Sequence, residues 1–433
     1  VQYYIWHDDL TGRALASELL SAADRGVRVR VLLDDMDARP RGEMLALIDR
    51  HPNIEVRMFN PFSSRSGALR TALEFLGRGA RLNRRMHNKS WTADGRVAVI
   101  GGRNIGDEYF AASEGVNFID LDVALFGAAV AQVETAFDAY WNHPASVPIG
   151  HLRGRAPEGA TLDDLRAKAR ASTEEGQRSP YAQRLAEKFR TASDLTDPGR
   201  YVWTSDVRVV TDDPRKVEDA KALEPGVLES MVEELRTTQS EALLISPYFV
   251  PGKGGTQALT DLASGGARVS VVTNSLAATD VAAVHSGYAK RRKPLLEGGV
   301  RLYEIKPSPA ISADDQRMRL GSSHASLHTK AVVVDRARVF VGSFNFDPRS
   351  ASLNCEMGAW IGDASLAARV AEWFERGAEP EHSFTVSLDG DGDLLWSERV
   401  DGAMLTHDQD PYASWGRRAT ATFLSWLPIE SQL

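Results

Sequence analysis

The chain has 433 residues, which is long enough for two α/β domains that each bury their own core. Its composition is that of a globular protein, with 43% hydrophobic and 25% charged residues, and no apolar run is long enough to predict a transmembrane helix. The net charge of −8 argues against nonspecific binding to nucleic acid. The single cysteine, Cys355, excludes an intrachain disulfide framework and disfavours a cysteine-based metal site. The chain starts at Val1 inside an apolar run, which we interpret as a truncated N-terminus, so an upstream signal or membrane anchor stays open.

The first part of the chain alternates strand and helix patterns. An apolar run at residues 3–6 precedes a helical spacing of leucines and alanines at residues 15–23. A turn glycine, Gly26, lies in an alternating strand pattern at residues 25–34, and a further strand is predicted at residues 54–59. This alternation predicts a mostly parallel sheet with helices packed against it.

The same order of elements returns in the second half. Strands predicted at residues 242–250, 266–273 and 300–305 repeat those of the first half, and Gly266 lies 240 residues beyond Gly26. The expected fold is therefore α/β, with two pseudo-symmetric lobes that are each a mostly parallel mixed sheet flanked by helices. Two such lobes can place equivalent residues across a pseudo-two-fold axis.

The duplication also predicts how the chain is divided. The predicted segments are a first lobe, a charged helical connector, a second lobe, and a C-terminal hairpin with an amphipathic helix, at residues 1–148, 149–200, 201–384 and 385–433, respectively. The terminal helix is expected at residues 417–427. Its apolar stripe, which includes Phe423 and Trp426, favours packing in the core over anchoring in a membrane.

Each half carries a His-x-Lys-x4-Asp motif, followed by a glycine and an asparagine at the same distance. The His-to-Asn spacing is 17 residues in both copies, and the two histidines are 241 residues apart. The motif residues are His87, Lys89, Asp94 and Asn104 in the first copy and His328, Lys330, Asp335 and Asn345 in the second. A His and a Lys two apart on a strand face the same side, and an Asp-Gly turn returns the chain antiparallel, which brings the asparagine back near the histidine. The aspartates fall at the turns, where local hydrogen bonding favours a structural role.

These residue types suit the transfer of a phosphoryl group. A neutral imidazole is a competent nucleophile toward phosphorus, and lysine and asparagine donors can stabilise the charge that spreads over the transition state. A second histidine can protonate the leaving alkoxide and then deprotonate the incoming hydroxyl. Because two lysines supply the positive charge, we expect no metal and no cofactor.

A nucleophilic histidine also needs a carboxylate on its other ring nitrogen. On the strand that follows each motif, Glu356 is the candidate in the second copy, and Asp122 matches it best in the first. Arg103 and Ser343, beside the two asparagines, are candidate substrate contacts. His7 is a third candidate, because it follows the first strand at the sheet edge where α/β proteins bind ligands.

At these residues the sequence resembles the phospholipase D superfamily, and within it bacterial cardiolipin synthases of the C-type. The resemblance covers nearly the whole chain, and the matching segments are residues 3–9, 82–90, 101–109, 342–350 and 427–430. It implies a metal-independent phosphatidyl transferase that moves a phosphatidyl group onto the glycerol headgroup of phosphatidylglycerol, with phosphatidylethanolamine as an alternative source lipid. It also implies a covalent phosphohistidine. By analogy His87 is the nucleophile and His328 the general acid/base, and the pseudo-symmetry leaves the reverse open.

The same resemblance implies a peripheral protein of the bacterial inner membrane, at its cytoplasmic face. Phospholipids are the expected substrates, no nucleic acid is expected to bind, and a partner protein stays open. Residues 57–89 combine eight basic residues with one acid and interleaved apolar side chains. Such a segment indicates either contact with an anionic membrane or a solvated basic face.

Three other functions stay open on the sequence alone. A phospholipase D would pass the phosphatidyl group to water and release phosphatidic acid. A phosphodiesterase nuclease shares the motif, although the acidic net charge counts against it. A catalytically inert lipid-binding scaffold is disfavoured by the intact motif in both halves.

Overall fold

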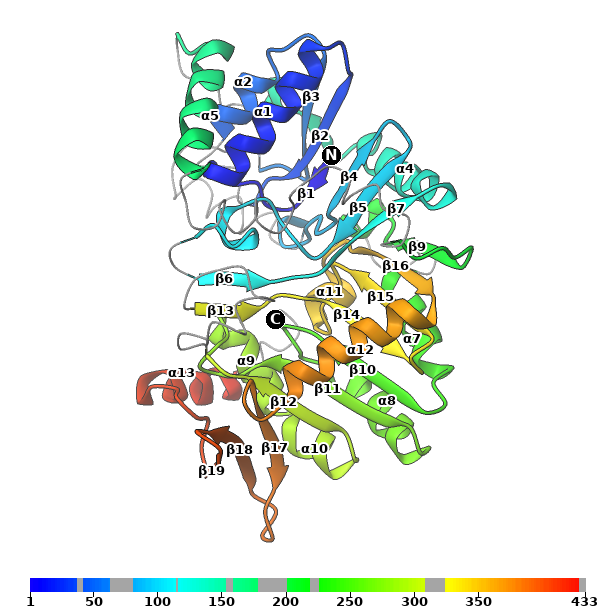
Figure 1. Cartoon of the computed structure of the whole chain (residues 1–433), viewed down its shortest axis with the longest axis vertical. Coiled ribbons are helices and arrows are strands. Elements are labelled where there is room, and N and C mark those ends of the chain that lie inside the picture. The colour runs from blue at the N-terminus through cyan, green and yellow to red at the C-terminus, as the bar shows by residue number, and fades with distance from the viewer. Residues whose placement is uncertain are drawn as a thin grey trace.

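The computed structural model describes residues 1–36, 42–62, 81–113, 116–152, 159–177, 201–218, 226–307 and 324–427. Two mixed sheets flanked by helices lie one above the other in Figure 1. A two-stranded ribbon of β6 (Val116–Ile119) and β13 (His324–Leu327) lies between them. The predicted α/β class with two lobes is confirmed.

The first sheet has seven strands in the order β7-β5-β4-β1-β2-β3-β8. Their bounds are β1 (Gln2–Tyr3), β2 (Val29–Asp34), β3 (Ile54–Phe59), β4 (Ser90–Ala93), β5 (Val97–Gly101), β7 (Asp122–Phe126) and β8 (Ser146–Pro148). The pairs β1–β2 and β2–β3 are parallel, and the flanking pairs are antiparallel. The tight turn at Asp94 and Gly95, both with positive φ, makes β4 and β5 antiparallel. Parallel pairing is limited to the centre of the sheet.

The second sheet has ten strands in the order β19-β18-β17-β12-β11-β10-β14-β15-β16-β9. Their bounds are β9 (Val207–Thr211), β10 (Glu241–Ile245), β11 (Arg268–Asn274), β12 (Arg301–Ile305), β14 (Ala331–Val334), β15 (Arg338–Gly342), β16 (Met357–Gly362), β17 (Ser383–Leu388), β18 (Leu394–Val400) and β19 (Ala403–His407). Again the central pairs β10–β11 and β11–β12 are parallel. The C-terminal strands extend this sheet, because β17 pairs with β12.

The duplication holds at the level of strand register. In the first hairpin Ser90 pairs with Ile100, and in the second Ala331 pairs with Val341. Both pairs repeat the 241-residue offset of the two histidines. The two motifs therefore begin equivalent hairpins, β4–β5 and β14–β15.

The helices pack against both sheets and also join them. Their bounds are α1 (Leu10–Asp24), α2 (Gly42–Ile48), α4 (Ala128–Trp141), α5 (Leu162–Gln177), α7 (Val227–Arg236), α8 (Gly252–Ser264), α9 (Ala282–Ala289), α10 (Arg292–Glu297), α11 (Pro348–Ser352), α12 (Ala364–Ala378) and α13 (Trp415–Trp426). Val130 and Val133 of α4 share one apolar cluster with Val370 and Phe374 of α12 and with strands of both sheets. This shared core fixes one lobe against the other.

The connector is partly helical, as predicted. The expected helix at residues 163–171 lies within α5, which packs against α1. The second expected helix, at residues 182–191, lies outside the described residues. Residues 63–80 of the basic segment also lie outside them, while Phe59 and Phe62 of that segment are buried in the protein.

The expected C-terminal helix is present as α13, but its packing differs from the prediction. Phe423 and Trp426 are exposed, so the expectation that this stripe packs in the core is wrong. The reason is that two arginines occupy the side that faces the protein. Among the described residues, no helix has the length and apolar character needed to cross a membrane.

Candidate active site

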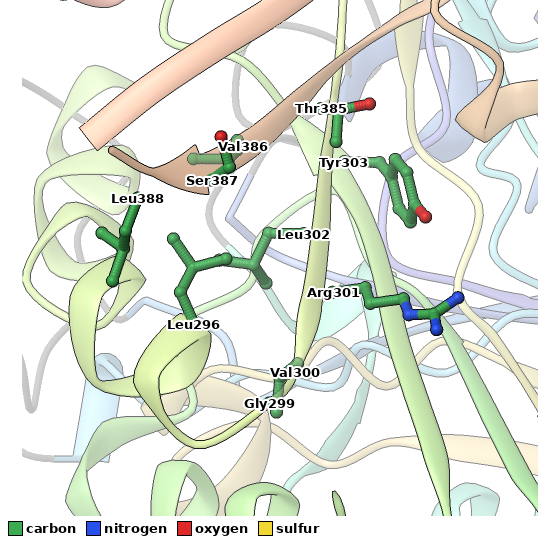
Figure 2. A pocket seen from close by; sticks show the side chains of 10 residues that line it. All are labelled: Leu296, Gly299, Val300, Arg301, Leu302, Tyr303, Thr385, Val386, Ser387 and Leu388. Atoms are coloured by element: carbon green, nitrogen blue, oxygen red, sulfur yellow. The ribbon is translucent and has the colours of Figure 1, made fainter. Parts of the chain in front are cut away.

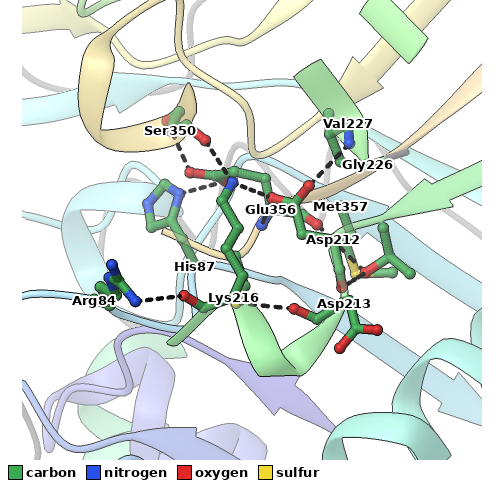
Figure 3. A network of polar contacts seen from close by, with 12 residues as sticks. Arg84, His87, Asp212, Asp213, Lys216, Gly226, Val227, Ser350, Glu356 and Met357 are labelled. Atoms are coloured by element: carbon green, nitrogen blue, oxygen red, sulfur yellow. Dashed lines mark hydrogen bonds and ion pairs between the residues drawn. The ribbon is translucent and has the colours of Figure 1, made fainter. Parts of the chain in front are cut away.

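The first motif histidine lies on a segment that pairs with the second lobe. The backbone N–H of His87 donates to the Cys355 carbonyl at 2.8 Å, and that of Cys355 donates to the Arg85 carbonyl at 2.8 Å. The next residue, Glu356, therefore comes beside the imidazole, with its Oε2 2.8 Å from His87 Nδ1 (Figure 3). The Glu356 carboxylate is fully buried. It contacts the histidine of the other lobe, across the interface.

The second histidine repeats this arrangement in the opposite direction. The His328 N–H donates to the Ile119 carbonyl at 2.8 Å, which continues the parallel pairing of β13 with β6. Asp120 follows Ile119, and its Oδ2 lies 2.5 Å from His328 Nδ1. Each lobe thus supplies a buried carboxylate to the histidine of its partner lobe.

The carboxylate expected at Asp122 is instead that of Asp120, two residues earlier. Asp122 Oδ2 accepts a hydrogen bond from Arg103 Nε at 2.7 Å. The same guanidinium donates to the Asp120 carbonyl at 3.0 Å and to the Tyr109 carbonyl. Arg103, expected as a substrate contact, therefore braces the segment that carries Asp120, and Asp122 is its ion-pair partner.

Hydrogen bonds hold both oxygens of Glu356. Ser350 Oγ donates to Oε1 at 2.8 Å (Figure 3). Ser343 Oγ donates to Oε2. The Glu356 N–H donates to the Asp212 carboxylate at 3.0 Å, which also accepts from Lys216 Nζ at 2.7 Å. Ser343, expected as a substrate contact, is buried and orients the carboxylate instead. Ser350 lies at the end of the segment 342–350 that carries the family resemblance, whereas only their contacts identify Asp212 and Lys216.

The two motif lysines are buried beside their histidines. Lys89 Nζ donates to the His87 carbonyl at 2.6 Å, and Lys330 Nζ donates to the His328 carbonyl at 2.5 Å. Each ammonium group is therefore held by the backbone of its own motif histidine, in the same way in both copies.

The two asparagines are buried near the end of the hairpins. Asn104 Oδ1 accepts from the Ile5 N–H at 3.3 Å. The Asn345 N–H donates to Ser350 Oγ at 3.2 Å, while its side-chain Oδ1 has no partner among the described residues. A buried amide with spare hydrogen-bonding capacity fits a group that contacts a ligand.

Aromatic rings pack against both imidazoles. Tyr4 lies edge-on to His87, with ring centroids 5.0 Å apart. Tyr109 takes the equivalent edge-on position beside His328 at 5.3 Å, and Phe118 lies 5.1 Å from the same ring. Tyr109 and Phe118 come from the first lobe, so the apolar wall around His328 also crosses the interface. Tyr4 and Tyr109 lie in the segments 3–9 and 101–109 that carry the family resemblance, whereas Phe118 lies outside them.

Burial and charge set the protonation of the first pair. Burial lowers the pKa of His87 to about 4, although Glu356 opposes this effect. Burial by itself would raise the pKa of Glu356, but the charges and hydrogen bonds of His87 and Lys89 hold it at about 2. At neutral pH the carboxylate is therefore ionised and the imidazole neutral. The Nδ1–H then donates to Glu356, and the Nε2 lone pair faces away from it.

The second pair, His328 and Asp120, has pKa shifts in the same directions as the first. Burial, followed by the charge of Lys330, lowers the pKa of His328. The pKa of Asp120 is also lowered, because the charges and hydrogen bond of His328 and Lys330 outweigh the effect of burial. Burial lowers the pKa of both motif lysines, Lys89 most of all. A bound phosphate would offset these shifts in His328 and the lysines, because an anion favours their charged forms.

His7 belongs to a network at the start of α1. Its Nδ1 lies 3.1 Å from Glu108 Oε1 and 3.8 Å from Asp9 Oδ2. Asp9 caps the helix by accepting from the Gly12 N–H and also accepts from the Asp107 N–H. His7, Asp9 and Glu108 form a group that could hold a cation among the described residues, but Asp9 is already engaged by these backbone donors.

Comparison with known proteins places this geometry in a family. The family described as "Cardiolipin synthase, PLD-like domain" matches residues 1–141 and 231–377, which include both motifs. Cardiolipin synthase C of Escherichia coli (strain K12) is 41% identical over 432 residues, covering 99% of this chain and 90% of the relative. The chain belongs to the cardiolipin synthase family of the phospholipase D superfamily. It is thus a phosphatidyl transferase of the phospholipase D type.

Two further matches extend over most of the chain. An uncharacterized protein of Helicobacter pylori is 30% identical over 433 residues, covering 99% of this chain and 83% of the relative. The crystal structure of a phosphatidylserine synthase from Haemophilus influenzae Rd KW20 superimposes with a TM-score of 0.58 and 16% identity, covering 89% of this chain and 81% of that one. At that identity the likeness shows the two-lobed fold alone.

One hollow on the second lobe contains none of the candidate site residues. It measures about 450 Å³ and lies between the end of α10, β12 and β17 (Figure 2). Leu296, Leu302 and Leu388 form its apolar part, and Arg301 and Tyr303 lie at one side. The hollow is therefore separate from the cardiolipin synthase motifs.

The two motif aspartates are expected to differ in what they contribute to stability. Both have positive φ, so alanine at either position incurs the same kind of backbone strain. Asp335, however, accepts from the N–H groups of Gln239, Ser240 and Glu241, whereas Asp94 is exposed. Asp335→Ala should therefore lower the free energy of unfolding by about 1–3 kcal/mol more than Asp94→Ala. Urea unfolding of both variants measures this, and equal losses would contradict it.

The acid limb of the pH–rate profile is expected to lie well below the usual histidine range. A nucleophilic His87 acts through its neutral form, and its pKa is lowered to about 4. The kcat/KM value for bis(4-nitrophenyl) phosphate, whose 4-nitrophenolate leaves without a proton from His328, should therefore stay constant as pH falls from 7 and decline only as it approaches about 4. The measurement needs circular dichroism at each pH to show that the protein stays folded. An acid limb near 6.5, the ordinary value for histidine, would contradict the expectation.

Proposed function

We propose that this protein makes cardiolipin by transferring a phosphatidyl group to the glycerol headgroup of phosphatidylglycerol, through a phosphohistidine at His87. The observation that carries the proposal is the pair of imidazoles, each with Nδ1 held by a carboxylate of the opposite lobe. Because each Nδ1 is held by a carboxylate, both Nε2 atoms are left to react with one shared phosphodiester under this proposal. We propose residues 1–148 and 201–384 as the two lobes that build the site, with residues 149–200 and 385–433 as additions to them.

In the first step His87 Nε2 attacks phosphorus, and the bond from phosphorus to the donor headgroup oxygen breaks. His328 gives a proton to the leaving oxygen, so the headgroup departs as an alcohol. That alcohol is glycerol when the donor is phosphatidylglycerol and ethanolamine when it is phosphatidylethanolamine. In the second step His328 takes the proton of the incoming hydroxyl, whose oxygen attacks phosphorus while the bond to His87 breaks.

We assign the nucleophile to His87 because its carboxylate is the more firmly held of the two. Glu356 receives hydrogen bonds from two serine hydroxyls in addition to the imidazole. Asp120 has one further donor, the N–H of Leu121. A fixed carboxylate keeps the imidazole in one orientation and one tautomer, which favours an in-line attack.

Charge stabilisation is assigned to the lysines and asparagines of both motifs. Lys89 and Lys330 lie buried beside the two histidines, where their charge acts in a low dielectric. Asn104 and Asn345 are also buried, and their side-chain NH₂ groups can donate to phosphoryl oxygens. We propose that these four groups stabilise the equatorial oxygens, so the reaction is independent of metal.

The membrane is the source of both substrates under this proposal. We place the protein at the cytoplasmic face of the bacterial inner membrane as a peripheral protein. The support is the name of its Escherichia coli relative, a cardiolipin synthase, because such substrates are bilayer lipids. A surface that contacts lipid is then required.

The deciding experiment offers the purified protein vesicles that contain phosphatidylglycerol labelled in its glycerol headgroup and, in a parallel reaction, in its acyl chains. Labelled cardiolipin in both reactions, with release of one glycerol per cardiolipin, is the expected result. Phosphatidic acid as the sole lipid product would replace the proposal with hydrolysis. Adding phosphatidylethanolamine tests the donor, since release of ethanolamine reports its use. DNA at low salt serves as a control, and its cleavage would favour a nuclease.

A further inference from the structure

The C-terminal helix α13 turns its charged residues inward and its aromatic residues outward. Arg417 Nε donates to the Leu276 carbonyl at 2.6 Å, and Arg418 Nη1 donates to the Ala413 carbonyl at 2.7 Å. The opposite side of the helix presents an exposed and uncharged surface. Its members are Trp415, Gly416, Ala419, Thr420, Thr422, Phe423 and Trp426. This polarity is the reverse of a helix that packs on a core and faces water.

The exposed aromatic side chains are large and lie on one stripe. Trp415 is 80% exposed, Phe423 58% and Trp426 79%. Positions 8 and 11 residues beyond Trp415 fall within about a quarter-turn of it on a helix with 3.6 residues per turn. Met404 and Leu405 of β19 add exposed apolar area to the same part of the chain.

This part of the chain concentrates exposed apolar residues. Of the twelve large hydrophobic side chains exposed among the described residues, six lie within residues 404–426. Trp415, Phe423 and Trp426 line one groove, and exposed apolar side chains gathered in this way mark an interaction surface in a folded protein. Tryptophan and tyrosine in particular are enriched where a protein meets the headgroup layer of a bilayer. We call the exposed stripe of Trp415, Phe423 and Trp426 the aromatic surface.

The aromatic surface is connected to the active site through one loop. Arg417 donates to the carbonyls of Leu276 and Thr279, and α13 packs against α9 (Figure 1). The carbonyl of Ala278, in the same loop, accepts from Ser326 Oγ at 3.2 Å. Ser326 lies two residues before His328. Hydrogen bonds from α13 to this loop, and from Ser326 to the same loop, therefore link α13 to the segment that carries His328.

We propose that the aromatic surface docks onto a lipid bilayer, with Trp415, Phe423 and Trp426 inserted among the headgroups. The proposal rests on the proposed function, because lipid substrates require that the site reach a bilayer. A groove of about 980 Å³ between α13 and the β18–β19 hairpin carries Asp389, Asp393 and Asp408 on its wall. These acids oppose attraction to anionic headgroups, so docking depends on aromatic insertion and is only weakly sensitive to salt.

Vesicle sedimentation of the full chain tests this proposal. The test variant combines Trp415→Ser, Phe423→Ser and Trp426→Ser. The matched control is Trp203→Ser, since Trp203 is also 80% exposed but belongs to the segment just before β9. In Figure 1, β9 and α13 lie on opposite sides of the view. Vesicles of phosphatidylcholine with phosphatidylglycerol should bind the triple variant about 10- to 100-fold more weakly than the wild type, and should bind the control like the wild type. Raising the salt concentration should change the binding of the wild type by less than about threefold.

Activity on bis(4-nitrophenyl) phosphate, a soluble diester, is measured on the same samples. The triple variant should retain it, which shows that the fold and the site are intact, and the single Trp426→Ser variant should show an intermediate loss of binding. Equal binding of the triple variant and the wild type would overturn the proposal. So would a wild-type dimer that the triple substitution converts to a monomer without loss of vesicle binding, because the surface would then belong to a second copy. Vesicle binding is read without turnover, so failure to make cardiolipin would count against the proposed function alone.

Discussion

A His87→Asn variant is expected to lose phosphatidyl transfer by a factor of about 10⁴ or more. The substitution removes the nitrogen that attacks phosphorus, and asparagine cannot form an equivalent covalent intermediate. Asparagine is close in shape to part of the imidazole ring, so the contact with Glu356 can be kept by its amide. Initial rates of cardiolipin formation from labelled phosphatidylglycerol measure the effect.

His51→Asn is the matched control for this variant. His51 is also buried, and its Nε2 lies 3.2 Å from the Asp24 carboxylate, outside the proposed site. The control should keep transfer within about threefold of the wild type, since only a structural contact is altered. Substantial transfer by His87→Asn would mean that phosphorus is not attacked by this residue.

The second large effect is expected for a substitution at Asp120, and it distinguishes the role of Asp120 from that of Asp122. Asp120→Asn should lower the rate of transfer by about 10²- to 10⁴-fold, because the carboxylate fixes His328 and stabilises its protonated form. Asp122→Asn should lower it by less than about tenfold, because asparagine can still accept from Arg103. Glu356→Gln should resemble Asp120→Asn, since it acts on His87 in the same way. Steady-state kcat values for the three variants decide this.

The comparison also has a clear contrary outcome. If Asp122→Asn were the more damaging substitution, the contact between Asp120 and His328 would not be the one that operates in catalysis. Melting temperatures of the variants show whether a loss of transfer comes from a loss of stability, because Arg103 also donates to the Asp120 carbonyl. A loss of transfer without a loss of stability is the result that supports orientation.

The chemistry of the site could be predicted from the sequence because its signals are local. A histidine and a lysine two residues apart, a turn, and an asparagine 17 residues beyond the histidine all lie on one hairpin. The structure accordingly has His87 and Lys89 at the start of the first hairpin and equivalent residues at the second. The carboxylates that contact the histidines were harder to predict, because each contacts the histidine of the other lobe.

Strand register shows why Asp122 was the wrong choice. Gly101 pairs with Asp122, and its counterpart Gly342 pairs with Gly358. The residues two positions before each partner are the two carboxylates that contact histidines. Matching the copies by these glycine partners would therefore have identified Asp120, whereas matching by the nearest acidic residue on the strand did not.

The terminal helix shows a different limit. The spacing of Phe423 and Trp426 predicts a helix with an apolar side, and the structure has such a helix. Spacing cannot say which side faces the protein, because this depends on partners that are distant in sequence. Here Arg417 donates to a carbonyl in the loop before α9, 141 residues earlier in the chain, so the aromatic residues on the other side of the helix face outward.

The most direct test of the central claim is to trap the covalent intermediate. A phosphatidyl 4-nitrophenyl ester is a suitable donor, since 4-nitrophenolate leaves without a proton from His328. A His328→Asn variant should then accumulate one phosphatidyl group, because the acceptor hydroxyl is no longer activated, and mass spectrometry of peptides quenched at alkaline pH should locate it on His87. The absence of bound lipid, or bound lipid on any residue other than His87, would contradict the account.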